Sequence, residues 1–431
     1  MHGDQFPAAE KILSDIENVF KRDKDLKDFE ILPVTVGENK SPVLHAEHTL
    51  GLQEWCVRHL YVHVYHKLTN LKQQQRLRRE DPNTLSRLLL GGVLLNPDCT
   101  FLWNIRRELI VMGRFDLFSD LHINAVTLSR RPKSSEAFVY RRWLLSRILE
   151  SYLDASTTLS ILEEELRVTL MAANRYANNY HAWNHRMWIM SHLPQAQDHF
   201  INEWVSSEEW ISKHVSEHSG LQYREYLFKQ IMQNVGHTYF CHKLRLSLEN
   251  FFLPLKSSEL YCVSLKDSTP LKQLHSLVID ILEQKDFCSS CPIKCGSNPH
   301  ILHIGFLAYE LLLVTELIRL YPGHEALWCH RRFVLFSLYS IVKEINTYEA
   351  SKSDISDGVP HPKAQKLSVS DIEIECNFLW SVIVRHEESL LEECSLCTPE
   401  ESYQSKLAFR HQEWVEKILK RSGSCVKQST S

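Results

Sequence analysis

The sequence is poor in the two residues that most often interrupt helices. Its 431 residues include only 13 glycines and 15 prolines. A protein built from many short strands needs more turn residues than this, so we expect a mainly helical chain. Hydrophobic residues make up 44% and charged residues 24% of the sequence, which is typical of a folded globular protein.

The sequence lacks the features that are typical of nucleic-acid-binding, membrane-spanning and secreted proteins. The net charge is −4 and no dense run of Lys or Arg occurs, which argues against nucleic acid as a partner. The most apolar segment, 301–320, carries Glu310, Glu316 and Arg319, too many charges for a membrane-spanning helix. The first 28 residues mix charged and apolar side chains and contain no secretory signal pattern. We therefore predict a cytoplasmic protein with no stable membrane insertion.

Motifs of independent catalysis and cofactor binding are also missing. The sequence contains no glycine-rich phosphate loop, no nucleophile elbow and no HExxH motif. The chain therefore offers no active site of its own, and we expect no cofactor on it.

Cysteine and histidine, in contrast, are abundant, with 12 and 23 copies. The potential metal ligands are the cluster Cys288, Cys291 and Cys295, the nearby His300 and His303, the pair Cys394 and Cys397, and the helically spaced His59, His63 and His66. Structural zinc needs four closely spaced ligands, and the two cysteine groups lie about a hundred residues apart. Free thiols in a reducing compartment are the favoured interpretation, with a zinc site as the alternative.

One motif recurs along the chain: proline, five residues, an aromatic residue, two residues and then two arginines. The complete copies are Pro97, Trp103, Arg106 and Arg107; Pro132, Phe138, Arg141 and Arg142; and Pro322, Trp328, Arg331 and Arg332. A further copy keeps Trp183 and Arg186 but has Ala177 and Met187 at the other two positions. Another has Leu221 and Arg224, and a last candidate, Leu407 and Arg410, is strongly eroded.

The motif predicts a repeated helical hairpin. Apolar residues at helical spacing precede and follow each copy, which indicates a unit of helix, turn and helix in about 35 residues. Proline marks the turn, because it cannot continue the preceding helix. The aromatic residue and the arginine three positions later share a helix face, so we interpret both as packing residues between neighbouring hairpins.

The repeats suggest the organisation of the whole chain. The predicted segments are an N-terminal helical extension at 1–82, four repeats at 83–255, a loop-rich insertion at 256–300, a further repeat at 301–345, a disordered insertion at 346–370, C-terminal helices at 371–420 and a mobile tail at 421–431. Between the fourth and fifth copies there is room for another unit.

The units NPDCTFLWNIRR, PKSSEAFVYRR, NNYHAWNHR and YPGHEALWCHRR resemble the alpha-subunit repeat of protein prenyltransferases. The resemblance covers residues 83–339 and implies an all-α fold, a crescent-shaped, right-handed superhelical solenoid of antiparallel helix hairpins. Tetratricopeptide repeats have a similar period, but their pattern of Trp, Leu-Gly and Tyr is not found.

The resemblance also implies a role in catalysis by a heterodimer. In this family the alpha subunit wraps a beta subunit that holds a catalytic zinc and a pocket for an isoprenoid diphosphate. A cysteine thiolate near the C-terminus of a protein substrate attacks the allylic carbon, and diphosphate leaves. Zinc is thus expected on the beta partner, and the isoprenoid diphosphate is the cosubstrate.

Four residues of this chain match family positions that face the diphosphate. They are Lys133, five positions before the aromatic residue of the second repeat, and Asn179, Tyr180 and His181 of the third repeat. The usual Tyr of the second repeat is replaced by Ser135, which has a shorter reach. The alternative interpretations are a solvated turn lysine, and interhelical packing and capping by the other three.

Two functions follow from this resemblance. The first is the alpha subunit of a geranylgeranyltransferase that shares the beta subunit of Rab geranylgeranyltransferase, acting on a protein with a C-terminal-region cysteine. The second is a non-enzymatic scaffold for protein binding, which the altered positions Ser135, Met187 and Leu221 favour. The preserved NNYHAW segment favours the first.

Overall fold

The computed structural model describes residues 6–33, 41–151, 154–194, 196–234, 299–353, 369–396 and 402–420. The chain divides into two compact units, Met1–Pro194 and Gln195–Ser431. Most of the described residues are helical, so the prediction of an all-helical repeat architecture is confirmed. None of the described helices combines the length and the apolar character needed to span a lipid bilayer.

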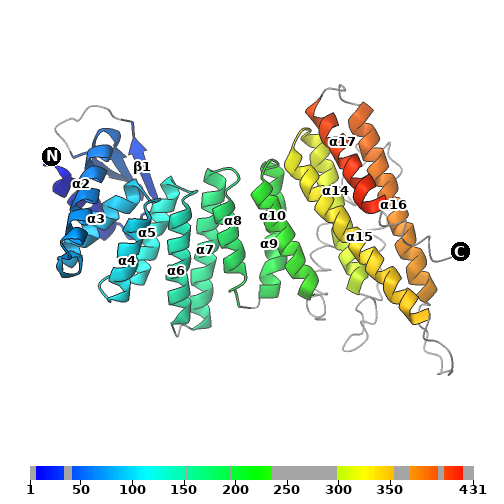
Figure 1. The fold of residues 1–431 in the computed structure, drawn as a ribbon, viewed down its shortest axis with the longest axis horizontal. Helices are drawn as coiled ribbons and strands as arrows, with labels where there is room; N and C mark the ends of the chain where they lie inside the picture. Colours follow the sequence, from blue (N-terminus) through cyan, green and yellow to red (C-terminus); the bar gives the residue numbers. More distant parts are fainter. Residues whose placement is uncertain are drawn as a thin grey trace. The chain divides into compact units, whose positions relative to one another are not determined.

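The first unit begins with helices and a small sheet (Figure 1). Its N-terminal elements are α1 (Ala9–Arg22), β1 (Asp28–Leu32), β2 (Val43–Ala46), β3 (Thr49–Gln53), α2 (Glu54–Gln73) and the 3-10 turn η1 (Leu77–Arg79). The strand order is β1-β3-β2, in which β1 pairs parallel to β3 and β2 pairs antiparallel to it. The segment 1–82 was predicted to be helical, and that prediction is wrong for these strands.

The sheet is tied to its surroundings by specific contacts. The turn between β2 and β3 places Glu47 and His48 at positive φ, 45° and 62°, and the carboxylate of Asp23 bonds His48 Nδ1 at 2.9 Å. On the other edge, the backbone N–H of Phe29 donates to Ser129 Oγ at 3.0 Å. The sheet therefore packs between the end of α1 and the repeat helices.

The remaining helices of the first unit form successive hairpins, which lie side by side in Figure 1. They are α3 (Pro82–Leu95) with α4 (Thr100–Val111), α5 (Leu117–Arg130) with α6 (Ser135–Glu150), and α7 (Ala155–Arg175) with α8 (Tyr180–Met190). Short polar residues begin most of these helices: Asp81, Asp116, Ser134, Asp154 and Asn179 each accept a hydrogen bond from a backbone N–H in the first turn. The motif prolines Pro97 and Pro132 lie in the turns just before these starts.

The described residues of the second unit form three more hairpins. They are α9 (Ala196–Lys213) with α10 (His218–Asn234), α14 (Pro299–Leu320) with α15 (Glu325–Ser353), and α16 (Val369–Leu396) with α17 (Tyr403–Val415), which continues into the π-helical turn η3 (Glu416–Lys420). Arg224 of α10 pairs with Glu310 of α14, and the ring of Trp204 in α9 lies 4.1 Å from that of Phe306. The fourth and fifth repeats are therefore direct neighbours. Among the described helices, no further repeat lies between them, although the sequence leaves room for one.

The structure can be compared with the predicted insertions and tail only in part. Helix α15 continues to Ser353, so the predicted disordered insertion at 346–370 is wrong for its first eight residues. The segments 256–298, 354–368 and 421–431 lie outside the described residues, as does the cysteine cluster Cys288, Cys291 and Cys295.

Candidate functional site

A series of buried arginines joins the hairpins of each unit. Arg106, Arg141, Arg224 and Arg331 are at most 1% exposed. Each donates through two nitrogens to a carboxylate on the first helix of the next hairpin: Asp120, Glu165, Glu310 and Glu387 respectively. Bidentate charge-assisted bonds of this kind are the strong class of hydrogen bond and fix geometry as well as distance.

Three of these arginines, Arg141, Arg224 and Arg331, also bind the first helix of their own hairpin. Arg141 Nη1 donates to the carbonyl oxygen of Leu121, twenty residues earlier, at 2.9 Å. The spacing of twenty residues repeats at Arg186, Arg224 and Arg331. Each of these four guanidiniums therefore connects both helices of one hairpin, and those of Arg141, Arg224 and Arg331 also reach the following hairpin.

A second polar residue contacts three of these carboxylates, and it lies just before the motif arginine of the next repeat; the fourth, Glu387, is contacted by His411. Tyr140 donates to Asp120, and His185 and His330 lie 3.5 Å and 2.8 Å from Glu165 and Glu310. Burial would raise the pKa of Glu310, but Arg224 and His330 outweigh burial and lower it to about 2. Glu165 and Glu387 also have a lowered pKa, because their arginine and histidine neighbours outweigh burial, so these three glutamates are ionised inside the protein.

The aromatic residues of the motif also lie in the interior. Trp103, Phe138, Trp183 and Trp328 are at most 4% exposed. Trp103 stacks on Tyr140 of the next repeat, with ring centroids 4.5 Å apart. Phe138 and Trp328 contact His185 and His411 with tilted rings, whose centroids are 5.6 and 5.1 Å apart. These positions are seams between repeats.

The second arginine of each motif lies nearer the surface. Arg107 stands over the rings of Tyr140 and Trp143, and Arg142 stands over Trp188 while donating to Asn184 Oδ1 at 2.9 Å. Arg332 is partly buried near Cys329 and opposes the rise that burial causes in the pKa of that thiol.

A second set of contacts connects the turns that precede the second helices. Asn179 is fully buried, and its amide nitrogen donates to the carbonyl oxygens of Pro132 and Ala172 at 2.6 and 3.1 Å. Its side-chain oxygen caps α8 at Ala182. In the preceding turn, Ser134 Oγ donates to the carbonyl oxygen of Pro97 at 3.3 Å. Asn179 therefore has a structural position, with both amide hydrogens directed to the protein.

The other three predicted site residues gather on the outer side of these turns. Lys133 is exposed, and its Nζ lies 4.5 Å from the centroid of the Tyr176 ring. Tyr180 is 53% exposed and its ring lies edge-on to His181, with centroids 5.7 Å apart. Burial first, and then the nearby ammonium of Lys133, lower the pKa of His181. Lys133, Tyr180 and His181 thus form one cluster with Tyr176, called the turn cluster below.

Cations outnumber carboxylates at the turn cluster, where Lys133 and Arg142 are opposed by the Asp98 carboxylate near His181. Lys133 supplies one cation, and Arg142 lies close enough to Tyr180 for the two to interact. Because its pKa is lowered, His181 is neutral near pH 7 and offers one N–H donor. The arrangement can hold a multiply charged oxygen-rich group through an ammonium, a hydroxyl and an imidazole.

Metal ligands do not come together in the described part of the chain. No group of three or more His, Cys, Asp or Glu side chains there could hold a metal ion. His63 instead contacts Glu10 at 3.2 Å, and Cys394 is buried and accepts a hydrogen bond from Gln404. Cys397 lies outside the described residues.

Comparison with known proteins gives concordant matches. The family described as protein prenyltransferase alpha subunit repeat matches residues 162–193 and 307–338, which contain the hairpins around Trp183 and Trp328. Protein prenyltransferase alpha subunit repeat-containing protein 1 of Homo sapiens is 32% identical over 76% of this chain and 77% of its own length. Protein 1-B of Xenopus laevis is 30% identical over 81% and 78%, and the Danio rerio protein 31% over 76% and 72%.

Repeat pattern and fold together define a helical-repeat protein of the prenyltransferase alpha-subunit type. The matches extend over three quarters or more of the chain. The chain therefore belongs to the family of protein prenyltransferase alpha subunit repeat-containing proteins.

Proposed function

We propose that this chain is the alpha subunit of a heterodimeric protein prenyltransferase, with transfer of a geranylgeranyl group preferred. The observation that carries the proposal is the turn cluster, in which Lys133, Tyr180 and His181 lie together although they come from two different repeats. Family membership supports the same function. The beta subunit would hold the zinc that keeps the substrate thiol ionised.

The turn cluster would act on the leaving group. As the carbon–oxygen bond of the isoprenoid diphosphate breaks, the electron pair moves to the diphosphate, whose negative charge grows. The Lys133 ammonium would stabilise that charge, and the Tyr180 hydroxyl and the neutral His181 ring would donate hydrogen bonds. Ser135, where the family usually has Tyr, is partly buried at the start of α6 and contributes little reach.

We choose the proposed beta subunit from how far the repeats of this chain diverge from the family pattern. Dedicated farnesyl alpha subunits match the repeat pattern more evenly than this chain, whose repeats carry Met187 and Leu221. A divergent alpha subunit can share an existing beta subunit, and that of Rab geranylgeranyltransferase is the proposed partner. The substrate would be a protein with a cysteine near its C-terminus.

Affinity purification followed by an activity assay tests the proposal. The tagged chain, isolated from cytosol, should bring down a prenyltransferase beta subunit in near-equal amount, and the pair should transfer geranylgeranyl to a cysteine-terminated protein. Lys133→Ala in the purified pair should lower kcat about tenfold to a hundredfold, because one preorganised cation is lost from the leaving group. Lys24→Ala, at an exposed turn of the same unit, should leave kcat unchanged.

A non-enzymatic scaffold is the second candidate. It is favoured by Asn179, which matches the family yet has its side chain fully used within the protein. Under this alternative no beta subunit would co-purify in near-equal amount, or the purified pair would transfer no prenyl group.

A further inference from the structure

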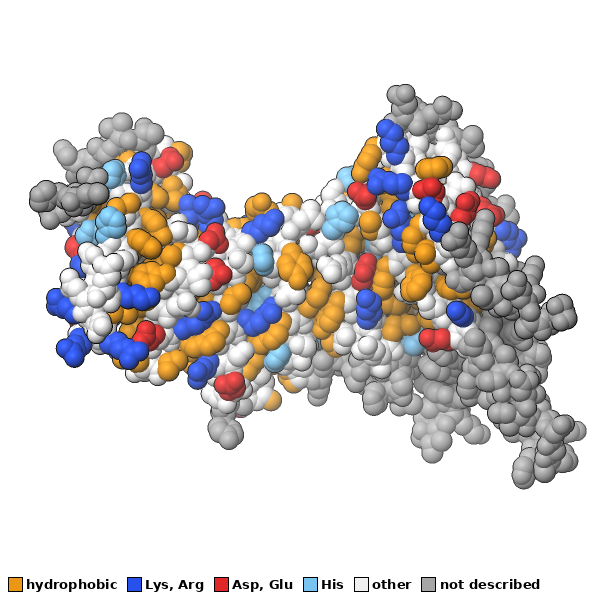
Figure 2. All heavy atoms as spheres, in the orientation of Figure 1, with side chains coloured by type: hydrophobic (Ala, Val, Ile, Leu, Met, Phe, Trp, Pro, Cys, Tyr) orange, Lys and Arg blue, Asp and Glu red, His pale blue; other side chains and the backbone are white. Residues whose placement is uncertain are grey.

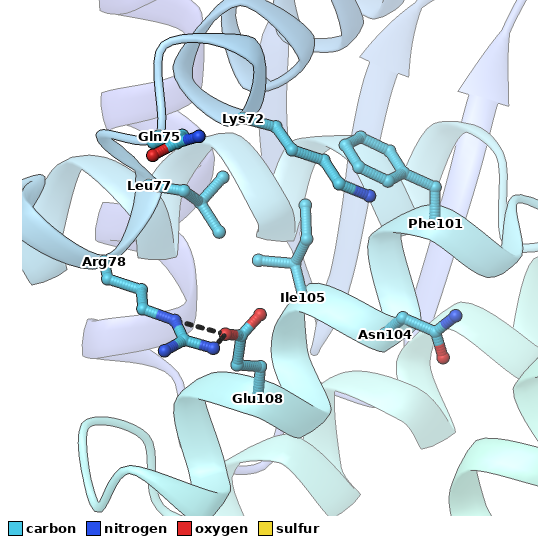
Figure 3. Close-up of a pocket in the computed structure, with 8 residues that line it drawn as sticks. All are labelled: Lys72, Gln75, Leu77, Arg78, Phe101, Asn104, Ile105 and Glu108. Atoms are coloured by element: carbon cyan, nitrogen blue, oxygen red, sulfur yellow. Dashed lines mark hydrogen bonds and ion pairs between the residues drawn. The ribbon is translucent and has the colours of Figure 1, made fainter.

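A hollow on the surface of the first unit lies away from the turn cluster. It is formed where α2 ends, where η1 follows and where α4 passes beneath them, and its volume is about 660 Å³. Figure 3 shows Lys72 reaching across it from one side, Asn104 and Glu108 from α4, and Arg78 closing the far side. We call it the α2–α4 hollow.

The α2–α4 hollow is lined mostly by polar and charged side chains, with one small apolar area on its wall. Leu77 and Ile105, which are 7% and 4% exposed, line it together with Phe101. The amide side chains of Gln75 and Asn104 stand at its edge. Such a surface fits one aliphatic or aromatic side chain and offers amide groups that can pair with a peptide backbone.

The charges at the hollow are unequal. Arg78 Nε donates to Glu108 Oε1 at 2.6 Å, so the charge of the one carboxylate in the lining is neutralised by Arg78. Lys72 lies 4.8 Å from the centroid of the Phe101 ring, and within the described residues no carboxylate bonds its ammonium. A cation without a bonded carboxylate, held beside an aromatic ring at the edge of the hollow, is a favourable place for an incoming carboxylate.

Further cations surround the rim. Arg76 and Arg79 are exposed at the two ends of η1, and Arg114 holds this segment by donating to the carbonyl oxygens of Arg78 and Glu80. Figure 2 shows Lys and Arg side chains gathered over the end of α2 and η1. Since the whole chain carries a net charge of −4, this local excess of positive charge is not a general property of its surface.

We propose that the α2–α4 hollow binds a short acidic peptide segment of a partner protein. An apolar side chain of the peptide would lie on Leu77 and Ile105, and a neighbouring carboxylate would pair with Lys72. Charge complementarity is the basis for choosing this occupant. The inference goes beyond the proposed function and does not depend on a beta subunit.

Fluorescence polarisation with the full-length chain tests this proposal. The probes are three fluorescein-labelled pentapeptides, each with a central Leu, Ile or Phe between two pairs of Glu, and matched peptides with Lys in place of every Glu. At least one acidic peptide should bind, and its Lys counterpart should not. Lys72→Glu should weaken binding about tenfold, because a charge-assisted bond becomes a repulsion.

Two variants separate the hollow from general charge attraction. Lys24→Glu changes the net charge equally at an exposed turn of the same unit, and it should leave the affinity unchanged. Asn104→Phe fills the hollow without altering charge and should abolish binding; Asn104 is an exposed helix position, so the chain should still fold, as circular dichroism can check.

Three results would overturn the proposal. The first is that no acidic peptide binds better than its Lys counterpart. The second is an equal loss in Lys72→Glu and Lys24→Glu, or full binding by Asn104→Phe. The third is that vesicles containing phosphatidylserine, but none of the peptides, bind in a Lys72-dependent way, which would assign the basic rim to a lipid surface.

Discussion

The buried arginine is the residue on which each repeat depends. Arg141 is 1% exposed, and it binds Glu165 of the next hairpin and Leu121 of its own. A buried ion pair is not in itself a large source of stability, because desolvation offsets most of the attraction. Removing only the arginine is costly, because the buried Glu165 charge then keeps only the longer contact to His185, at 3.5 Å.

Arg141→Met should therefore destabilise the protein by about 3–5 kcal/mol, because it leaves Glu165 ionised in the interior. The double variant Arg141→Met with Glu165→Leu should recover at least half of that loss, because the unpaired charge is removed as well. Urea unfolding of the wild type and the two variants measures both values. A double variant as unstable as the single one would show that the uncompensated charge is not the cause.

The sequence predicted the arginines of the seams but not their partners. Arg106, Arg141 and Arg331 each lie three positions after an aromatic residue, and Arg224 lies three positions after Leu221, so the regular spacing makes them visible in a single sequence. The carboxylates lie 14, 24, 86 and 56 residues after their arginines, so the spacing carries no regular signal. A regular signal does exist within each hairpin: Tyr140, His185 and His330 each contact a carboxylate twenty residues earlier.

At the scale of elements, the helices were predictable and the strands were not. β1 and β3 are five residues long, too short for alternation of apolar residues to distinguish a strand from a helical turn. The hairpin between β2 and β3 turns at Glu47 and His48 rather than at the Asn-Gly or Asp-Gly that usually marks such a turn. The bond from His48 to Asp23 supports this turn from outside the hairpin, and no local pattern reveals it.

In the hairpin of α9 and α10, a glycine allows the two helices to approach closely. A Cβ atom added at Gly220 in α10 would lie 2.5 Å from the ring of Trp210 in α9. Trp210 is stacked on His214, with centroids 4.0 Å apart, and so has little freedom to move. Hairpin geometry here thus requires a residue without a side chain.

Gly220→Ala should consequently destabilise the protein by roughly 1–3 kcal/mol, although alanine in a helix usually gains up to about 1 kcal/mol over glycine. In a Trp210→Leu background the clash is absent, and the same substitution should become neutral or stabilising. Thermal unfolding of the four proteins of this cycle gives the comparison. Stabilisation by Gly220→Ala in the wild-type background would contradict the overlap.

At the scale of the whole molecule, the repeat motif identified the architecture because packing between hairpins reuses the same residues. The fourth copy was degenerate in sequence, with Leu221 in place of the aromatic residue, yet its Arg224 pairs with Glu310 like the complete copies. The residues of the turn cluster could be predicted only through the family resemblance, because an exposed lysine and a Tyr-His pair carry no signal by themselves. Their proximity arises from stacking two turns, which only the three-dimensional structure displays.

Stability against acid is a property of both units, because buried histidines recur at the seams. Burial lowers the pKa of His185, His386 and His411. For His386, burial and then Arg331 lower it to about 3, against an ordinary value of 6.5. The unfolded chain therefore binds more protons than the folded one between these values, so stability falls as the pH drops below 6.5. His330 affects stability in the opposite direction. Burial opposes its protonation, but Glu225 and Glu310 outweigh burial and raise its pKa. Its stabilising contribution is therefore fully present below pH 6.5 and is lost as the pH rises through the raised pKa.

We expect the free energy of unfolding to decrease by roughly 2 kcal/mol between pH 6.5 and pH 5 on account of His386 alone. His386→Gln should remove that part of the pH dependence, because a glutamine amide can still bond Thr315 Oγ1, now 3.0 Å from the imidazole, without titrating. Urea unfolding at several pH values measures the slope, with His324→Gln at a partly exposed site of the same unit as the control. An unchanged slope in His386→Gln would show that this imidazole already carries its proton in the folded protein at pH 5, and that the seam tolerates the charge.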